Sequence, residues 1–364
     1  MSILLTIGTR PEAIKMAPII HELQKRDIPF QILHSGQHHD HTLARQLIQE
    51  LNIPQPAHTL QLTSDDPTRQ MAEILTHTHK TLRKTKARLL LVEGDTNTVL
   101  AASLAALRTD TPIAHIEAGL RSHDPRMPEE HNRRLVDHIS TLLFAPTQTA
   151  ANNLKSEDTQ GTTHVTGNTV IDACLKHTGT RTQQAATSEP PRFQNYILAT
   201  AHRAENVDDP QTLKEIAEAL LESPLPIVLP LHPRTRKRLE ELGLHQGLAE
   251  SKNQVQLLPP LGYHPFLQLM KNSQLILTDS GGIQEEATAP TIRKRVLVMR
   301  NSTERPEAVE AGFARVVGTT KQGILQGIDE ALDDDTPLPT ASPYGDGKAG
   351  ERITTILQTT LKEN

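Results

Sequence analysis

The sequence predicts an α/β protein with two doubly wound parallel sheets, and three observations support this fold class. Short apolar runs alternate with longer segments in which apolar residues recur at three- and four-residue steps, as expected for strands joined by helical crossovers. The alternation stops in a polar stretch at Gly179–Pro191 and then restarts. The chain has 364 residues, the length of about two domains.

The first half of the chain opens the pattern. Its predicted strands are the apolar runs Ile3–Ile7, Phe30–His34, Arg88–Val92, Pro112–Ile116 and Leu142–Ala145. Its predicted helices are the segments of helical period Glu12–Lys25, Asp40–Leu51, Pro67–Arg83 and Thr98–Arg108. Parallel strands need such crossovers, so each helix is expected to return the chain to the start of the next strand.

The second half repeats the pattern. Its predicted strands are Tyr196–Thr200, Pro226–Leu231, Val255–Leu258, Leu275–Thr278, Val296–Met299 and Ala314–Val317. Its predicted helices are Pro210–Leu221, Arg234–Leu242, Pro265–Lys271, Ile283–Ala287 and Gln322–Leu332. Ligands of doubly wound sheets bind beyond the carboxyl ends of the strands. We therefore expect two sheets that face a cleft lined by strand-end residues.

Charge and composition exclude several functional classes. Lys and Arg total 38 against 43 Asp and Glu, a formal net charge of -5, and the chain has no Trp, 3 Tyr and 5 Phe. A nucleic-acid partner is therefore not expected. A single Cys excludes a disulfide framework, and no apolar stretch approaches the roughly 18 residues of a membrane span. The N-terminal apolar run is too short for a secretory signal, so we expect a cytoplasmic protein without a membrane partner.

Two acids follow neighbouring predicted strands. Asp95 lies in Glu93-Gly94-Asp95-Thr96, and Glu117 lies in His115-Ile116-Glu117-Ala118. Carboxylates at strand ends can be partly buried and tuned as general acid or base. Asp95 could instead be an N-cap of the following helix. We favour an acid-base role for Asp95 and Glu117 together.

Basic residues follow the first strand, where the sequence reads Gly8-Thr9-Arg10-Pro11 and continues to Lys15. Cations near a helix N-terminus oppose the helix dipole, which suggests that an anion is the missing partner of Arg10 and Lys15. A solvated basic helix start would produce the same pattern.

Two further motifs hold candidate catalytic residues. Glu129 opens a helix after a loop that can reach the cleft, although an acid in a first turn also simply complements the dipole. His202 follows the first strand of the second sheet beside Arg203 and Glu205. A strand-end histidine with charged neighbours favours a catalytic interpretation over a structural one.

The sharpest local signal is Thr278-Asp279-Ser280-Gly281-Gly282 between a predicted strand and a predicted helix. Bare backbone amides and the helix dipole converge there, as a phosphate site requires. The motif lacks the Lys-Ser/Thr of a nucleoside triphosphatase loop. Arg305, at the start of a later helix, is a candidate phosphate clamp.

Three other patterns are rejected as sites. Gly345–Gly350 matches the dinucleotide-binding spacing, but no predicted strand precedes it. A histidine cluster at 34, 38, 39 and 41 lacks zinc-ligand spacing. Cys174 lies among apolar residues of helical period and is expected in the core.

Together these motifs resemble the non-hydrolysing UDP-N-acetylglucosamine 2-epimerase family. The matching segments span most of the chain in the family's order: Gly8–Pro18, Ser35–His38, Gly94–Ala106, His115–Arg121, Pro128–Arg133, Val165–Ala173, His202–Asn206, Tyr263–Phe266, Thr278–Ala287 and Thr303–Gly312. The resemblance implies the fold of GT-B type glycosyltransferases. It implies an N-terminal domain of residues 1–170 completed by helix 349–364, and a UDP-binding domain of residues 171–348.

The resemblance implies reversible inversion at C2 of UDP-N-acetylglucosamine, through elimination of UDP to 2-acetamidoglucal and re-addition, for surface polysaccharide precursors. Asp95, Glu117, Glu129 and His202 are the catalytic residues that it implies. The implied UDP ligands are Arg10, Lys15, Phe266, Ser280, Gly281, Gly282, Glu286 and Arg305. A second UDP-N-acetylglucosamine is implied as activator at Gln37, His38, Arg69 and His232. The resemblance also implies a homodimer. No metal or nicotinamide cofactor is expected, because UDP is both leaving group and nucleophile.

Two departures from the family pattern leave the substrate open. The short loop before Pro128 and the string at His202–Val207 look more like archaeal members and members that act on UDP-2,3-diacetamido-2,3-dideoxyglucuronate. Arg126 is the candidate partner of that sugar's carboxylate. The segment Thr288–Arg295 replaces a shorter family stretch and is expected either to perturb UDP binding or to bulge into solvent. A glycosyltransferase, a hydrolysing epimerase and a UDP-sugar sensor compete with the epimerase hypothesis.

Overall fold

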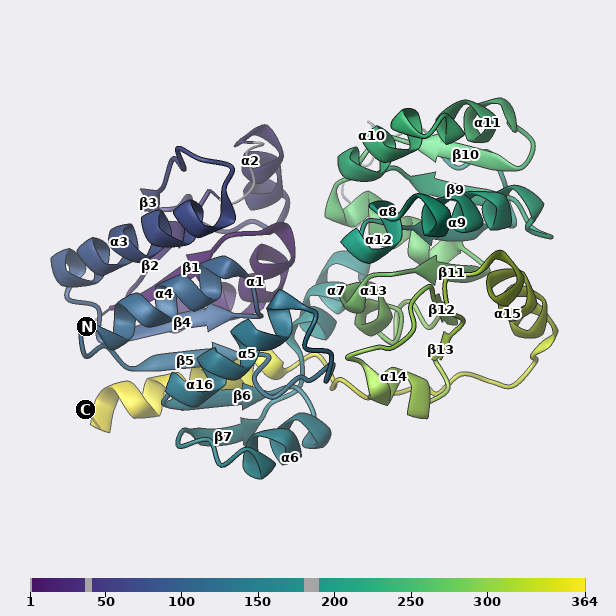
Figure 1. Ribbon diagram of the computed structural model, residues 1–364. Coiled ribbons are helices and arrows are strands. Elements are labelled where there is room, and N and C mark those ends of the chain that lie inside the picture. Colours follow the sequence, from purple (N-terminus) through teal and green to yellow (C-terminus); the bar gives the residue numbers. More distant parts are fainter. Residues whose placement is uncertain (1, 37–40, 180–189, 364) are drawn as a thin grey trace. The chain divides into compact units, whose positions relative to one another are not determined.

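The computed structural model describes residues 2–36, 41–179 and 190–363 (Figure 1). The chain divides into two compact units. Unit 1 comprises Met1–Ala173 and Tyr344–Asn364, and unit 2 comprises Cys174–Pro343. Most of the polar stretch predicted at 179–191 lies outside the described residues. Each unit contains one parallel sheet with helices, so the predicted α/β class is confirmed.

Within the described residues, unit 1 contains a seven-stranded parallel sheet of order β3-β2-β1-β4-β5-β6-β7. The strands are β1 (Ile3–Ile7), β2 (Phe30–His34), β3 (His58–Thr59), β4 (Leu89–Glu93), β5 (Ile113–Ile116), β6 (Leu142–Ala145) and β7 (Thr162–Val165). The central strands β1 and β4 are buried throughout, as expected for a sheet covered on both faces.

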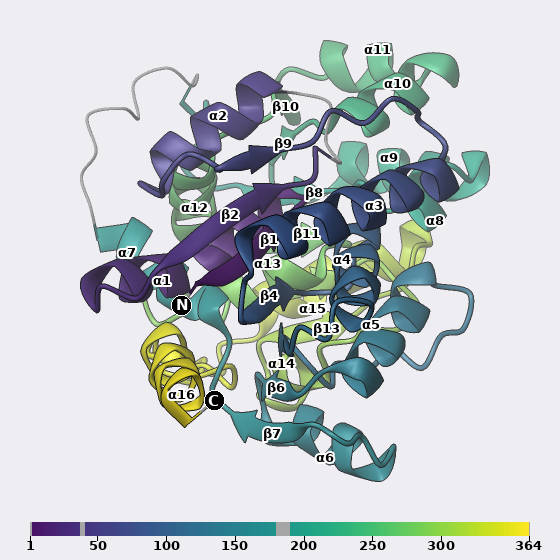
Figure 2. The same cartoon turned by 90° about the vertical axis from the view of Figure 1, so that its left-hand side faces the viewer.

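The helices of unit 1 cover its sheet on both sides (Figure 2). They are α1 (Arg10–Lys25), α2 (His41–Glu50), α3 (Pro67–Thr85), α4 (Asn97–Leu107), α5 (Pro128–Ile139), α6 (Gln148–Ser156) and α16 (Ala349–Glu363). One core cluster joins the sheet to α3, α4 and α5 through Leu90, Ile74, Val99 and Val136. Helix α4 is almost entirely buried because its residues are nearly all small or apolar.

Helix α16 comes from the far end of the chain and packs on α1 (Figure 2). Arg26 donates to the Thr355 hydroxyl at 2.8 Å, and a Cβ atom at Gly350 would lie 3.1 Å from Pro18. Asp172, in α7 (Thr169–Gly179), accepts from the first amides of α16, including that of Gly350 at 2.9 Å. These contacts tie α16 into unit 1.

Unit 2 contains, within the described residues, a six-stranded parallel sheet of order β10-β9-β8-β11-β12-β13. The strands are β8 (Ile197–Thr200), β9 (Ile227–Pro230), β10 (Val255–Leu258), β11 (Leu275–Thr278), β12 (Val296–Val298) and β13 (Ala314–Val316). The helices are α8 (Ala204–Val207), α9 (Pro210–Glu222), α10 (Pro233–Glu241), α11 (Leu244–Glu250), α12 (Tyr263–Asn272), α13 (Gly281–Glu286), α14 (Pro306–Glu310) and α15 (Lys321–Asp333). Its core includes Leu213 and Ile216 of α9 and Ile324 and Ile328 of α15.

The sequence pattern missed the elements with little apolar character. Strand β7 has the sequence Thr-Thr-His-Val and is largely exposed at the sheet edge, and β3 has only two residues. Helix α6 is polar apart from a few buried positions such as Ala150 and Leu154. Periodicity detects buried faces, so short edge elements escape it.

Gly119 provides a test of the turn that follows β5. Its φ is +84°, and an added Cβ would overlap the carbonyl oxygen of Ala150. We expect Gly119→Ala to lower the free energy of unfolding by about 2–5 kcal/mol, from backbone strain plus overpacking. Gly243→Ala is the control, because Gly243 has a φ of +68° but open space around it, and should cost only about 1–2 kcal/mol. Urea unfolding of both variants measures the difference, and equal losses would contradict the packing argument.

Candidate active site

Each sheet has one point where neighbouring strands send their connections in opposite directions. In unit 1 this point lies between β1 and β4, and in unit 2 between β8 and β11. Doubly wound proteins bind ligands at the carboxyl ends of the strands at this point. The predicted residues Arg10, Asp95, His202 and Ser280 all lie in the segments that leave these four strands.

Lys15 is the centre of the buried charge in unit 1. Its Nζ lies 2.5 Å from Glu117 Oε1 and 3.4 Å from Glu93 Oε1. Asn168 Nδ2 donates to the same oxygen of Glu117 at 2.7 Å. The three charged side chains are at most 7% exposed. The structure thus places Lys15 among carboxylates.

Glu12 joins the same region from the first turn of α1. Its carboxylate accepts from the Gly8 amide at 2.7 Å and from the hydroxyls of Thr9 and Thr96 at 2.9 Å. Burial raises the pKa of Glu12 to about 7, although these donors act to lower it. Glu12 therefore fixes the turn after β1 and titrates near neutrality.

Asp95 is held by an arginine of α5. Its carboxylate pairs with Arg133, whose other terminal nitrogen lies 2.5 Å from Glu130. The possibility that Asp95 caps α4 is wrong, because the N-cap is Thr96. The Asp95 side chain is 30% exposed, so a bound molecule can reach it. Glu129 lies half-buried in the first turn of α5.

The pKa of Glu130 lies below its ordinary value. Burial acts to raise this pKa, but donation from the Ser122 amide and the charge of Arg133 outweigh burial. Glu130 therefore stays ionised near neutral pH, and it anchors both Arg133 and the loop before α5.

A second buried network holds the segments that follow β4 and β5. His115 contacts Asp137 through Nδ1 and the carbonyl oxygen of Gly94 through Nε2, both at 2.8 Å. A carbonyl oxygen only accepts, so Nε2 is the donor to Gly94. Arg121 pairs with Asp137 at 2.8 Å and with Glu157 at 2.7 Å.

Glu117 has a strained backbone. Its φ is +66°, which side-chain-bearing residues rarely adopt. Asp137 accepts from the Gly119 amide at 3.1 Å and so helps to hold the turn that contains Glu117. Such strain persists where the surroundings overdetermine it and clusters at functional sites.

In unit 2, His202 is oriented by Asp279. The carboxylate lies 3.2 Å from His202 Nδ1 and accepts from the backbone amides of His202 and Arg203 at 2.8 and 2.9 Å. Burial acts to raise the pKa of Asp279, but the hydrogen bond and charge of His202 hold this pKa below its ordinary value. The His202 side chain is 37% exposed, so its other ring nitrogen is available to a ligand.

The predicted phosphate loop forms the start of α13. Ser280 is the N-cap, and a Cβ at Gly282 would meet nothing within 4 Å. At Gly281, in contrast, a Cβ would lie 2.7 Å from Glu304 and 3.5 Å from Arg305. A side chain at 281 would therefore displace the Glu304 carboxylate, whereas glycine at 282 leaves the backbone open to an approaching anion.

Arg305 lies buried beside this loop. Its Nε pairs with the fully buried Glu285. Glu304 in turn lies 2.6 Å from Arg300 and 3.3 Å from Arg203. Arg305 is thus part of an ion-pair network beneath the glycines.

Glu286 ends α13, and Phe266 belongs to α12. Glu286 is buried and shares a hydrogen bond with the Tyr263 hydroxyl. Cys174 is buried, as predicted, with its Sγ 3.5 Å from the same hydroxyl. Phe266 lies half-buried in the first turns of α12.

The structure describes two of the four residues predicted for an activator. Gln37 and His38 lie outside the described residues. Arg69 is exposed near the start of α3. His232 is exposed in unit 2, with its ring centroid 5.7 Å from that of His202.

Arg10, predicted as a UDP ligand, is half-buried as the first residue of α1.

The segment Thr288–Arg295 does not bulge into solvent. Thr288, Ala289 and Ile292 are buried, and Arg293 donates to the carbonyl of Leu338 at 2.6 Å. The insertion is therefore packed against the chain that precedes Pro343.

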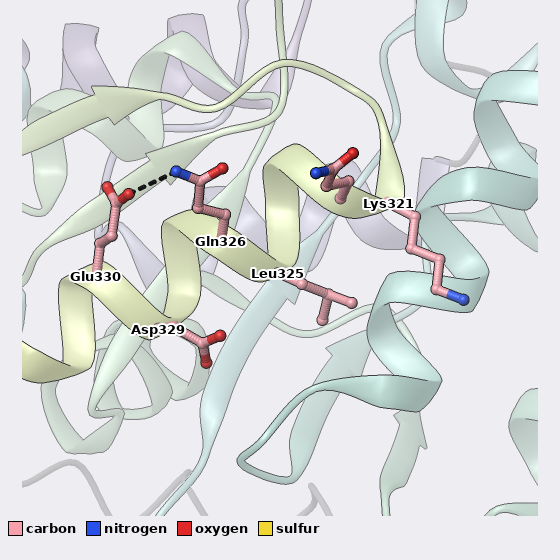
Figure 3. Close-up of a pocket in the computed structure, with 6 residues that line it drawn as sticks. Lys321, Leu325, Gln326, Asp329 and Glu330 are labelled. Atoms are coloured by element: carbon pink, nitrogen blue, oxygen red, sulfur yellow. Dashed lines mark hydrogen bonds between the residues drawn. The ribbon is translucent and has the colours of Figure 1, made fainter.

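Other features carry no part of the candidate site. No helix among the described residues is long and apolar enough to cross a bilayer, and no three His, Cys, Asp or Glu side chains among these residues are grouped for a metal ion. A hollow of about 540 Å³ lies along α15, lined by side chains that include Lys321, Leu325 and Glu330 (Figure 3). None of the predicted site residues lines it.

Sequence reasoning missed the buried partners. Glu93, Arg133, Asn168 and Asp279 each lie inside a motif or a family-matching segment, yet the sequence pattern does not mark them as site residues. A charged residue at the end of an otherwise apolar strand, such as Glu93, was the available signal. Which partner each of them contacts depends on the fold.

Comparison with known proteins identifies the family. The family model for UDP-N-acetylglucosamine 2-epimerase matches residues 21–358. The chain belongs to this family. It is therefore an epimerase, an enzyme of the isomerase class.

Named relatives cover nearly the whole epimerase. UDP-N-acetylglucosamine 2-epimerase of Methanocaldococcus jannaschii is 41% identical over 98% of this chain and 99% of its own. UDP-2,3-diacetamido-2,3-dideoxy-D-glucuronate 2-epimerase of Pseudomonas aeruginosa is 38% identical, with the same two coverages. A crystal structure of the Methanocaldococcus jannaschii UDP-GlcNAc 2-epimerase in complex with UDP-GlcNAc and UDP covers 99% of this chain and 100% of that one, with a TM-score of 0.90 and 40% identity.

The raised pKa of Glu12 gives a pH test. The unfolded chain releases this proton near pH 4.5 and the folded chain near pH 7, so the folded state binds more protons between these values and stability falls as pH rises. We expect Glu12→Gln to remove about 2–4 kcal/mol of the decline in unfolding free energy between pH 4.5 and 7.5. Urea unfolding across this range measures both slopes, and parallel slopes would contradict the assignment.

Proposed function

We propose that this epimerase interconverts UDP-N-acetylglucosamine and UDP-N-acetylmannosamine by inversion at C2. One observation carries the proposal: Asp95 and Glu117 follow the neighbouring strands β4 and β5 in a chain 40% identical to an enzyme whose crystal structure holds UDP-GlcNAc and UDP. The chemistry needs groups that remove and return a proton, and Asp95, Glu117 and Glu129 are the candidates.

The reaction proceeds by elimination and re-addition. A carboxylate takes the proton from C2, the electron pair of that bond forms the C1–C2 double bond, and the C1–oxygen bond breaks to release UDP and 2-acetamidoglucal. In the second step a carboxylic acid protonates C2 on the opposite face while a phosphate oxygen of UDP attacks C1. Protons and electrons balance over the two steps, and no outside oxidant is required.

Unit 2 supplies the UDP-binding groups in this proposal. The open amide of Gly282 and the dipole of α13, together with Ser280, bind the diphosphate. His202, oriented by Asp279, donates to the departing phosphate oxygen. Glu286, with Tyr263 behind it, accepts from the ribose hydroxyls, and Phe266 lies beside the uracil. Arg10 and Arg305 add positive charge for the phosphates, and Lys15 supports the carboxylate of Glu117.

Proton NMR of the purified protein with UDP-N-acetylglucosamine in deuterium oxide tests this function. We expect a new anomeric signal of the manno sugar, deuterium at C2 of both sugars and little free UDP. Accumulating free UDP would indicate a hydrolysing epimerase, and transfer to an added acceptor would indicate a glycosyltransferase. Binding without exchange at C2 would indicate a sensor.

A second substrate is favoured by one relative. UDP-2,3-diacetamido-2,3-dideoxyglucuronate carries a carboxylate at C5, and the relative that acts on it is 38% identical to this chain. Arg126 is 84% exposed and lies 2.7 Å from Asp124. The same NMR assay with both sugars ranks them by kcat/KM, and a large preference for the uronic acid would replace the first proposal.

Substitution separates chemistry from binding. We expect Asp95→Asn to reduce turnover by about 10²–10⁴-fold, the usual contribution of one acid or base, while UDP affinity stays measurable by calorimetry. Asp110→Asn is the matched control, because Asp110 is exposed and its φ of +51° suits Asn. Loss of UDP binding in Asp95→Asn would contradict an acid-base role.

We propose further that a second UDP-N-acetylglucosamine activates the enzyme through Gln37, His38, Arg69 and His232, and that the enzyme is a homodimer. Arg69→Ala should change the dependence of rate on substrate concentration and leave UDP binding unchanged. Equal losses of binding in Arg69→Ala and Asp95→Asn would contradict this division of roles.

A further inference from the structure

We propose that Glu93 is a protonated carboxylic acid that donates a hydrogen bond to Glu117 and thereby sets how readily Glu117 takes up a proton. This inference rests on the proposed acid-base role of Glu117. Glu93 acts through Glu117, so it is a positioning residue.

The geometry brings the two carboxyl groups together around one ammonium. Glu93 is the last residue of β4, and its side chain is 2% exposed. Lys15 Nζ lies 3.4 Å from Glu93 and 2.5 Å from Glu117. The two carboxyl groups also share a hydrogen bond, which requires a proton on one of them.

The distribution of donors indicates which group carries the proton. Glu117 receives the short contact of Lys15 and the amide of Asn168, as an ionised carboxylate requires. Glu93 Oε1 is fully buried and accepts no hydrogen bond from the described residues, and Lys15 lies 3.4 Å from it as an ion-pair partner. An ionised carboxylate left in this way would suffer a large desolvation cost, whereas a neutral acid does not.

The balance of buried charges also indicates that Glu93 carries the proton. The charged and titratable groups that face Glu93 are Lys15 and Glu12 from α1 and Glu117 from the turn after β5. One ammonium cannot neutralise two or three buried carboxylates, and two close carboxylates hold a proton between them. Burial, together with Glu117 and Glu12, raises the pKa of Glu93 well above its ordinary value, although Lys15 lowers it.

The pair has a consequence for the reaction. Donation from Glu93 stabilises the anionic form of Glu117 and holds its carboxylate in one orientation. When Glu93 ionises as pH rises, a second negative charge faces Glu117 and the donor is lost. The pH profile of kcat should therefore contain a step that belongs to the pair.

Glu93→Gln tests this directly, because the amide keeps a donor and cannot ionise. We expect its kcat at neutral pH to stay within about threefold of wild type, and its alkaline step to disappear. Glu93→Leu removes the donor and should lower kcat by about 10- to 100-fold, the value of one hydrogen bond to a charged group. Glu250→Gln, at an exposed position, is the control. An inactive Glu93→Gln that still binds UDP, or one with an unchanged pH profile, would overturn the proposal.

A second measurement does not depend on turnover or on the folding of a Glu93 variant. Carbon-13 NMR of glutamate side-chain carboxyls in the wild type and in Glu12→Gln follows protonation with pH. We expect one glutamate in both proteins to keep its proton to a pH well above the ordinary titration range of glutamate. If no carboxyl does so in Glu12→Gln, the inference fails even where epimerisation is observed. If the protonated carboxyl is present without epimerisation, the proposed function fails instead.

Discussion

The cluster of buried carboxylates at the ends of β4 and β5 depends on one buried ammonium, that of Lys15. Lys15 is the cation around which Glu93 and Glu117 gather, and Asn168 completes the coordination of Glu117. Removing a partner from such a buried cluster leaves an uncompensated charge, which costs several kcal/mol. The sequence can change little at Lys15 without disturbing the carboxylates, and this constraint links α1 to the ends of two strands.

The surrounding hydrogen-bond networks hold the loops that carry the candidate site residues in place. His115 and Asp137 fix the Gly94 carbonyl and the Gly119 amide, which lie on either side of the acid-bearing turns. Asp279 has the same role in unit 2, where it orients His202 from below. In each unit a buried carboxylate, Asp137 or Asp279, holds a loop in place. A more exposed residue of the same region, Asp95 or His202, is then accessible to a ligand.

The fold was predictable because parallel strands are buried on both faces and therefore appear as continuous apolar runs. The strand-end motifs were predictable for a related reason. Each buried apolar run ends at the carboxyl edge of the sheet, and the polar residues that follow it are easily recognised in the sequence. The pairing partners were not, because Lys15 and Glu117 are separated by 102 positions and no local pattern connects them. The same limit applies to Arg305: its spacing suggested a phosphate clamp, but its contact with Glu285 depends on how α13 and α14 pack.

The position of α16 bears on how the chain is made. Unit 1 is discontinuous, because residues 344–364 return to it after all of unit 2 has been synthesised. Until then the surface of α1 around Arg26 and Pro18 lacks its helical cover, and Asp172 lacks the amides that it accepts from. All seven described strands of the unit 1 sheet precede unit 2, so unit 1 lacks only α16 while unit 2 is being synthesised. The nascent chain thus holds α1 without the helix that packs on it until residues 349–363 have been made.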